Sequence, residues 1–317
     1  MTPLIEVATK IGDVRTISPQ SPLSRLGRSL ADAIGPERLF FLDFHGDLGV
    51  RVIAPLLDQC AAYGLSFITV LSYQQLNRAD LLAKKIGFER GVCFRVPLRD
   101  RLRRTGQSFA EQLDRMLDVT VGDPGRADLV LDLGYIGQEP GFGPEHIRIA
   151  VAEVDDLLAW RTVALAGTVI PQTLSSVVEQ DDVGALERHD WNYWRRVRQL
   201  PLARQLSFSD YAVQHPERPD GGRGAMANIR YTGNREVIIA RGHKVTGADQ
   251  AQFRELARKI QQHSAFRGSA FSWGDHEIAM YADGAPPPLW SEDWRAFGTS
   301  HHIELVTEAL AEMERAA

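Results

Sequence analysis

A nearly unbroken apolar run stands at residues 128–135, which read Asp128-Leu129-Val130-Leu131-Asp132-Leu133-Gly134-Tyr135. Apolar residues that follow one another without alternation are typical of a parallel strand covered on both faces. Similar runs recur along the first two thirds of the chain, separated by longer segments of helical period. The expected strands cover residues 3–7, 39–44, 65–73, 92–98, 128–135, 162–170 and 205–212.

Helical patterns fill the intervals between these strands. Ser108 and Glu111 form the pattern of a capping box at the start of one helix. Regular alternation of strand and helix favours a parallel sheet with crossover helices. No glycine-rich phosphate loop follows the first strand, and closure removes sheet edges, so we predict a TIM-like (β/α) barrel with seven visible strand units. The expected helices cover residues 22–34, 48–63, 75–86, 109–119, 144–160 and 182–199.

The pattern changes after residue 212. Residues 215–224 are rich in glycine and proline and contain Arg218 and Arg223, which suits a mobile basic lid. A hairpin of residues 228–232 and 236–241 follows, then helices over 249–263 and 301–316. We therefore predict a barrel domain of residues 1–212 and an α+β appendage of residues 213–317 packed on it.

Composition restricts the classes of function. The 317 residues carry a net charge of −5, with a pI near 6.0, which argues against a general nucleic-acid binder or a membrane-surface protein. No apolar run is long enough to span a bilayer, and the first residues do not read as a signal peptide. Cys60 and Cys93 both lie in apolar segments, as expected for reduced, buried thiols in the cytoplasm.

Single charges interrupt four of the apolar strands. They are Glu6, Asp43, Arg95 and Asp132, each flanked by apolar neighbours. Because side chains alternate between the faces of a strand, these charges should point into the barrel if their neighbours face the helices. Each stands in the C-terminal part of its strand, where TIM-barrel enzymes hold their active sites. We expect the four to converge there.

The predicted site has two kinds of residue. The carboxylates of Glu6, Asp43, Asp132 and Asp210 are candidate catalytic groups, which could share a proton, divide into acid and base, or hold a divalent metal. Arg95, His45 and Arg241 are candidate binders of an anionic substrate. An internal salt-bridge network that only stabilises the barrel is the alternative. No cofactor is specified by the residues themselves.

Two later segments have less specific patterns. His301 and Glu304 stand three residues apart on one helical face, a spacing that can bind a metal. We favour a solvated face for them, opposite an apolar stripe of Ile303, Val306, Leu310 and Met313. Residues 271–275 are expected to form a tight turn as readily as a site.

Several short stretches, in order over nearly the whole chain, resemble the Beta protein family, which was first named from a bacteriophage. The resemblance implies phage or phage-defence biology, and an eight-stranded barrel whose leading strand is missing before Pro3. We expect residues 8–20, or a second copy of the chain in a homo-oligomer, to cover that gap. The matching stretches are Pro3-Leu4-Ile5-Glu6, Leu131-Asp132-Leu133-Gly134, Phe208-Ser209-Asp210-Tyr211-Ala212 with His215-Pro216, Asn228-Ile229-Arg230-Tyr231, Arg241-Gly242, Phe271-Ser272-Trp273-Gly274-Asp275, and Trp294-Arg295 followed by His301-His302.

Two classes of function stay open at this point. The first is a hydrolase or lyase for an anionic substrate, such as a phosphorylated small molecule or a nucleotide. The second is a catalytically silent binding subunit of a defence or toxin–antitoxin complex, with a protein partner. A charged cluster open to solvent favours the enzyme, whereas a neutralised cluster beside a large exposed apolar patch favours the binding subunit.

Overall fold

A computed structural model describes residues 2–7, 22–44, 48–98, 108–137, 143–217, 226–245, 251–286 and 291–316. The chain divides into two compact units. Unit 1 holds residues 1–133, 142–166 and 196–209, and unit 2 holds residues 134–141, 167–195 and 210–317. Two segments of the predicted barrel, 134–141 and 167–195, therefore group with the C-terminal residues, unlike the single boundary expected at residue 212.

A curled parallel sheet is the framework of unit 1, and all seven expected strands are present in it. Its strand order is β1-β2-β3-β4-β5-β6-β8, so β1 and β8 are its two ends. In the part of the chain that the structure describes, the sheet is a curled half-barrel, and a full TIM-like barrel stays a prediction. The strands are β1 (Leu4–Val7), β2 (Phe40–Phe44), β3 (Phe67–Leu71), β4 (Val92–Pro97), β5 (Ala127–Tyr135), β6 (Thr162–Thr168) and β8 (Ser207–Asp210).

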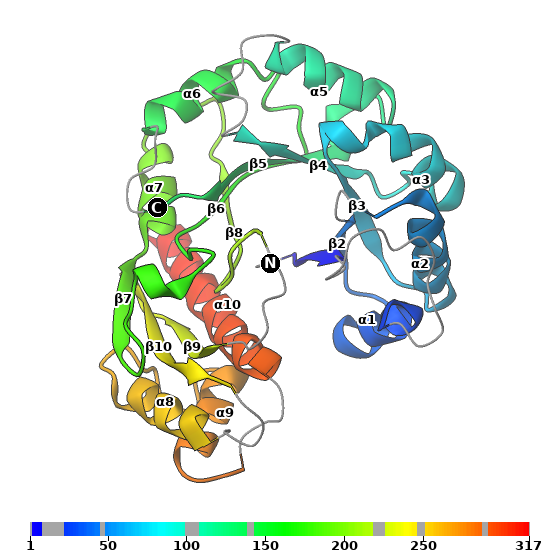
Figure 1. Ribbon diagram of the computed structural model, residues 1–317. Helices are drawn as coiled ribbons and strands as arrows, with labels where there is room; N and C mark the ends of the chain where they lie inside the picture. The colour runs from blue at the N-terminus through cyan, green and yellow to red at the C-terminus, as the bar shows by residue number, and fades with distance from the viewer. Residues whose placement is uncertain are drawn as a thin grey trace. The chain divides into compact units, whose positions relative to one another are not determined.

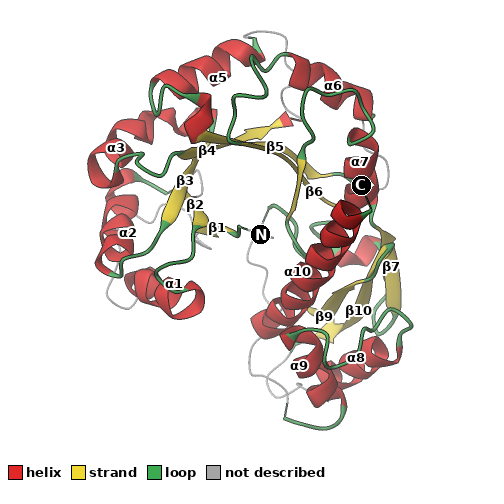
Figure 2. Cartoon of the chain, turned by 180° about the vertical axis from the view of Figure 1, so that it is seen from behind, coloured by secondary structure: helices red, strands yellow, loops and turns green. Residues whose placement is uncertain are grey.

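Helices cover the convex side of this sheet (Figures 1 and 2). The helix after residue 108 begins as predicted, with Ser108 as its N-cap residue, but the Ser108 side chain accepts no capping hydrogen bond. The backbone N–H of Phe109 instead donates to the Glu153 carboxylate, 3.3 Å away. The helices are α1 (Leu26–Ile34), α2 (Val50–Ala62), α3 (Ala79–Ile86), α5 (Phe109–Asp118) and α6 (Pro144–Ala152), with short 3₁₀ turns at Pro22–Arg25, Tyr73–Arg78 and Pro124–Arg126.

Unit 2 contains a three-stranded antiparallel sheet in the order β7-β10-β9. The hairpin of β9 (Met226–Thr232) and β10 (Glu236–Lys244) is confirmed. Strand β7 (Val183–Glu187) corrects the helix predicted over 182–199, because only the later part of that segment, α7 (His189–Val197), is helical. Residues of β7 pair with β10, about fifty positions later in the chain, and this long-range pairing overrides the local helical pattern.

Both faces of this sheet are buried. Ile238 and Ala240 of β10 face the core formed with α8 (Ala251–Gln262), α9 (Trp273–Ala282) and α10 (Ser291–Arg315). Val237 and Ile239 face a second cluster with Val169, Ile170, Val178 and Leu186, near the 3₁₀ turn Leu174–Ser176. The side chains of β10 therefore point alternately into two apolar layers, as expected for the central strand of a sheet.

Helix α10 differs from its prediction in length and in the face that it buries. It starts ten residues before the expected position and spans 25 residues. Ile303 of the predicted apolar stripe is 41% exposed, whereas His301 and His302 are buried together with Leu305 and Val306. No helix in the described ranges is long and apolar enough to cross a membrane.

A glycine allows α9 and α10 to approach each other closely. A Cβ atom at Gly274 would lie only 1.9 Å from the carbonyl oxygen of Phe297. We expect Gly274→Ala to lower the free energy of unfolding by about 1–3 kcal/mol, because the two helices must move apart. Gly49→Ala is the control, since nothing lies within 4 Å of its added Cβ. Urea denaturation of both variants measures the difference, and equal midpoints would contradict this packing.

Candidate functional site

Three carboxylates surround one guanidinium group in unit 1. Arg95 Nη1 lies 2.9 Å from Glu6 Oε2 and 2.9 Å from Asp43 Oδ2, and Arg95 Nε lies 2.8 Å from Asp132 Oδ2. The residues come from β1, β2, β4 and β5, and Glu6 stands beside Asp43 in the pairing of the first two strands. The predicted convergence of these four charges is therefore confirmed.

The cluster is shielded from solvent but not sealed. The side chains of Glu6 and Arg95 are 26% and 18% exposed, whereas those of Asp43 and Asp132 are 8% and 7% exposed. With every group ionised, three carboxylates and one guanidinium have a formal charge of −2. Charges at this depth interact more strongly than they would in water, so the ion pairs with Arg95 hold the three carboxylates close together.

An apolar layer lies next to the cluster on the same face of the sheet. Ile68, Val70, Cys93, Val130, Ala164 and Ala166 pack together there, with Phe41 against them. Burial, reinforced by the negative charges of Asp128 and Asp43, raises the pKa of the Cys93 thiol well above its usual value. The layer therefore supports the charged cluster mechanically, and Cys93 is a packing residue and not a nucleophile.

A second ion pair lies at the other ends of the strands. Asp128, near the start of β5, accepts two hydrogen bonds from Arg161, at 3.0 Å from Nε and 2.6 Å from Nη2. A bidentate pair of this kind fixes geometry as well as charge. The Arg95 cluster lies at the opposite, C-terminal ends of the strands, where barrel enzymes place their chemistry.

The other predicted site residues in the described ranges, Asp210 and Arg241, make their printed contacts within unit 2. Asp210 belongs to unit 2, where its Oδ2 lies 2.6 Å from His302 Nε2. Arg241 also belongs to unit 2, and its Nη1 donates to the carbonyl oxygen of Val178 at 2.7 Å. This hydrogen bond fixes the Arg241 guanidinium against the main chain of unit 2. His45 lies outside the described residues, as do most of the predicted lid and residues 8–20.

Unit 2 has a buried polar network around His301, a residue that we predicted on a solvated helix face. His301 is fully buried, with Nδ1 2.8 Å from Asp275 Oδ2 and Nε2 2.7 Å from the carbonyl oxygen of Thr232. Both ring nitrogens therefore lie within hydrogen-bonding distance of an oxygen atom. Tyr231 donates to Asp275 at 2.6 Å and stacks on the imidazole, and Ser272 donates to Asp275 at 2.6 Å.

This network ties three elements of unit 2 together. Ser272 is the N-cap residue of α9 and accepts from the backbone N–H of Asp275. Burial raises the pKa of Asp275, but hydrogen bonds from His301, Ser272 and Tyr231 outweigh it and leave the pKa below its usual value. The sequence did contain a signal, because Ser272 followed three residues later by Asp275 is an N-terminal capping pattern. The prediction for residues 271–275 was a tight turn as readily as a site, and this capping pattern was not part of it.

A second buried pair lies beside this network. Burial raises the pKa of Asp210, but the charge and hydrogen bond of His302, with the Ala212 N–H and Arg188, lower it overall. Arg188 is 2% exposed, and its burial lowers its pKa. Burial also raises the pKa of Asp190. Arg188, Asp190 and Asp210 are therefore polar groups removed from water within unit 2. The other ring nitrogen of His302, Nδ1, lies 2.9 Å from the Thr232 hydroxyl oxygen.

A metal has no evident set of ligands in the described residues, where no three His, Cys, Asp or Glu side chains are grouped to hold one. The three carboxylates that the sequence offered for this role are grouped around Arg95 instead. A divalent cation would compete directly with that guanidinium.

Fold and cluster together define an α/β protein with charged groups at the C-terminal ends of a curled parallel sheet. The chain belongs to the Beta protein family, whose family model matches residues 1–308. Membership therefore covers both units, as the resemblance of short stretches from Pro3 to His302 suggested. Neither the curated proteins nor the solved structures compared with the chain gave a match.

Proposed function

We propose that the protein is an enzyme of the hydrolase or lyase class that uses the carboxylates around Arg95 for acid–base chemistry. The observation that carries this proposal is the grouping of Glu6, Asp43 and Asp132 on a single guanidinium at the C-terminal ends of parallel strands. Three carboxylates that meet at one guanidinium are close enough to one another for a shared proton, which would provide an acid beside a base. Arg95 would position these groups and hold their charge in place.

The charge of the cluster favours a particular kind of substrate. The four side chains have a formal charge of −2, and Arg95 already contacts three carboxylates. An anion at this point would therefore be repelled. A neutral substrate suits this cluster if positive charge develops on it during the reaction, because the carboxylates then stabilise the transition state. Glycosides are one such class, because their transition states resemble an oxocarbenium ion. The phosphorylated substrate expected from the sequence stays a prediction, and the charge of the cluster is the argument against it.

A substitution at Asp132 tests the proposal. We expect Asp132→Asn to abolish turnover and to leave the melting temperature unchanged or higher, because the change removes one excess negative charge. The assay is a panel of chromogenic glycosides and esters with wild-type protein and the variant. Asp80→Asn, an exposed carboxylate at the start of α3, is the control and should retain activity.

The opposite pattern would support a purely structural cluster. Loss of one partner from a buried ion network lowers stability by about 3–5 kcal/mol. If Asp132→Asn unfolds this easily and wild-type protein turns over no substrate of the panel, the proposal fails. The alternative is then a catalytically silent binding subunit, which the pairing of all three carboxylates with Arg95 also suits.

The surroundings of the site form a second part of the proposal. We infer a TIM-like barrel, completed beside β1 by residues 8–20 or by the same region of a second copy, in a cytoplasmic protein of phage or phage-defence biology. Unpaired strand edges are unfavourable in water, which supports completion of the sheet. Light scattering at micromolar concentration distinguishes the two arrangements, since only the second requires a dimer.

A further inference from the structure

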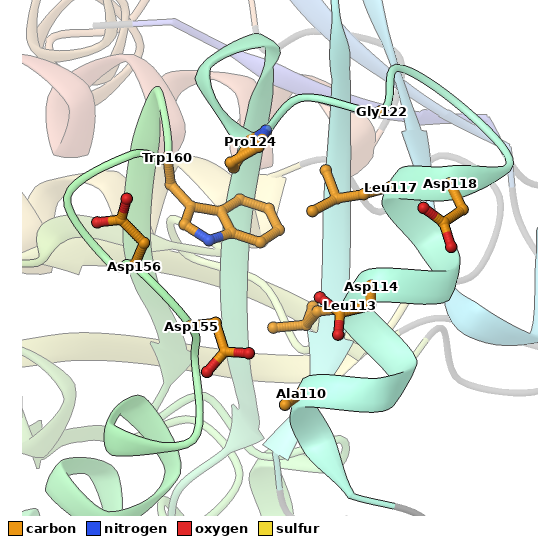
Figure 3. A pocket seen from close by; sticks show the side chains of 10 residues that line it. All are labelled: Ala110, Leu113, Asp114, Leu117, Asp118, Gly122, Pro124, Asp155, Asp156 and Trp160. Atoms are coloured by element: carbon orange, nitrogen blue, oxygen red, sulfur yellow. The ribbon is translucent and has the colours of Figure 1, made fainter.

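A cavity of about 450 Å³ lies in unit 1, apart from the Arg95 cluster (Figure 3). One wall is the face of α5 that carries Leu113 and Leu117, and the opposite wall is formed by Asp155 and Asp156, before β6. Pro124 and Trp160 complete it, and both precede strands. The cavity therefore lies at the N-terminal ends of β5 and β6. Its volume is in the range of small-molecule sites.

Four carboxylates line this cavity in two pairs. Asp114 and Asp118 are one helical turn apart on α5, and Figure 3 places Asp155 and Asp156 across the cavity from them. None of the four takes part in an ion pair or side-chain hydrogen bond with a described residue. Carboxylates in the last turns of a helix oppose its macrodipole, and like charges four residues apart repel. The stability of α5 does not explain their positions.

Trp160 provides an independent indication of a ligand. It is 3% exposed and packs edge-to-face on Phe94, with ring centroids 6.0 Å apart. Its indole N–H has no acceptor among the described residues, and this N–H opens onto the cavity while the rest of the side chain is buried. Figure 3 shows the indole nitrogen directed into the cavity, between the aspartate pairs. A bound molecule with an oxygen atom at this point would complete the hydrogen bond.

We propose that this cavity binds a small organic dication with an apolar spacer and a carbonyl or hydroxyl oxygen. The separated aspartate pairs would each hold one positive group, and Leu113, Leu117 and Trp160 would contact the spacer. The Trp160 N–H would donate to the oxygen. This site is independent of the proposed acid–base chemistry, and a failure of either leaves the other in place.

Two diamines that differ by one group test the proposal. Lysine amide and cadaverine have the same spacing of amines, and only lysine amide carries a carbonyl oxygen. At about pH 6 both amines of each probe are protonated. Isothermal titration calorimetry of the full chain should show binding of both, with lysine amide about tenfold tighter, the value of one good hydrogen bond. Higher salt should weaken both, because exposed charges are screened.

Variants separate the two parts of the site. Trp160→Phe keeps the ring and removes the N–H, so it should abolish the preference for lysine amide and retain cadaverine binding. Asp114→Asn and Asp155→Asn should each weaken both probes at least severalfold. Both side chains are exposed, so these variants should fold even if Trp160→Phe does not. Glu304→Gln, an exposed carboxylate of α10, should change nothing.

Three results would overturn the proposal. They are no detectable binding of either probe at millimolar concentration, equal affinities of wild-type protein for the two probes, and affinities that Asp114→Asn and Asp155→Asn leave unchanged. The last result would place the bound amines at another acidic surface of the chain.

Discussion

Arg95→Met is expected to lower the free energy of unfolding by about 3–5 kcal/mol, because it leaves three carboxylates together without their cation. The methionine retains most of the volume of the side chain, so the loss reports on charge and not on packing. Asp43 and Asp132 are the most buried of the three and account for most of the cost. Urea denaturation followed by circular dichroism measures it.

A compensated variant completes this test. Adding Asp43→Leu and Asp132→Leu to Arg95→Met removes the two buried carboxylates and leaves Glu6, the most exposed of the cluster. We expect this triple variant to recover most of the lost stability, as when buried ion networks are replaced by apolar residues. Arg148→Met, which breaks an exposed pair with Glu145, should scarcely move the denaturation midpoint. An Arg95→Met protein as stable as wild type would mean that the ion pairs contribute nothing.

Asp275→Asn should cost a comparable amount, about 3–5 kcal/mol, because it removes the buried carboxylate that contacts His301, Tyr231 and Ser272. The folded-state pKa of Asp275 lies below its unfolded value. The contribution of this carboxylate is therefore complete above the unfolded pKa of about 3.9 and is lost as the pH falls through the folded value. The variant should lose less stability than wild type between neutral and strongly acidic pH.

The matched control for this prediction is on α10, the helix that carries His301. Arg267 and Glu308 are 2.8 Å apart, but their side chains are 35% and 39% exposed. Glu308→Gln should change stability by no more than about 1 kcal/mol, since solvent screens such a pair. Chemical denaturation across the pH range compares the two variants. Equal effects of Asp275→Asn and Glu308→Gln would show that burial of the network does not set its strength.

The strands of unit 1 could be predicted because their pattern is local. A strand covered on both faces is apolar throughout, so a charge within it, such as Asp43 or Arg95, is conspicuous. The side on which that charge lies then follows from alternation. Convergence of the cluster was predictable for the same reason, because the carboxyl ends of parallel strands lie together. The individual ion pairs with Arg95 needed coordinates, since register between strands is not visible in a single sequence.

Unit 2 was predicted less well because its contacts are distant in sequence. β7 is a strand only through its pairing with β10, and His301 is buried only because α9 and β9 supply Asp275 and the Thr232 carbonyl oxygen. A periodicity argument assigns polar residues to the solvated side of a helix. Helical periodicity therefore predicts a buried Ile303 and an exposed His301 on α10, and both predictions are wrong. A buried charge is recognisable only when its partner is known.

Both cysteines lie in unit 1, and this allows the two units to be followed separately in one unfolding experiment. Cys60 and Cys93 are buried, and burial raises the pKa of Cys60 to about 11, so a thiol reagent can modify them only after unit 1 has opened. Intrinsic fluorescence reports mainly on unit 2, which holds Trp191, Trp194, Trp273 and Trp294. Coincident loss of both signals would identify one cooperative folding unit, and separate transitions would identify two.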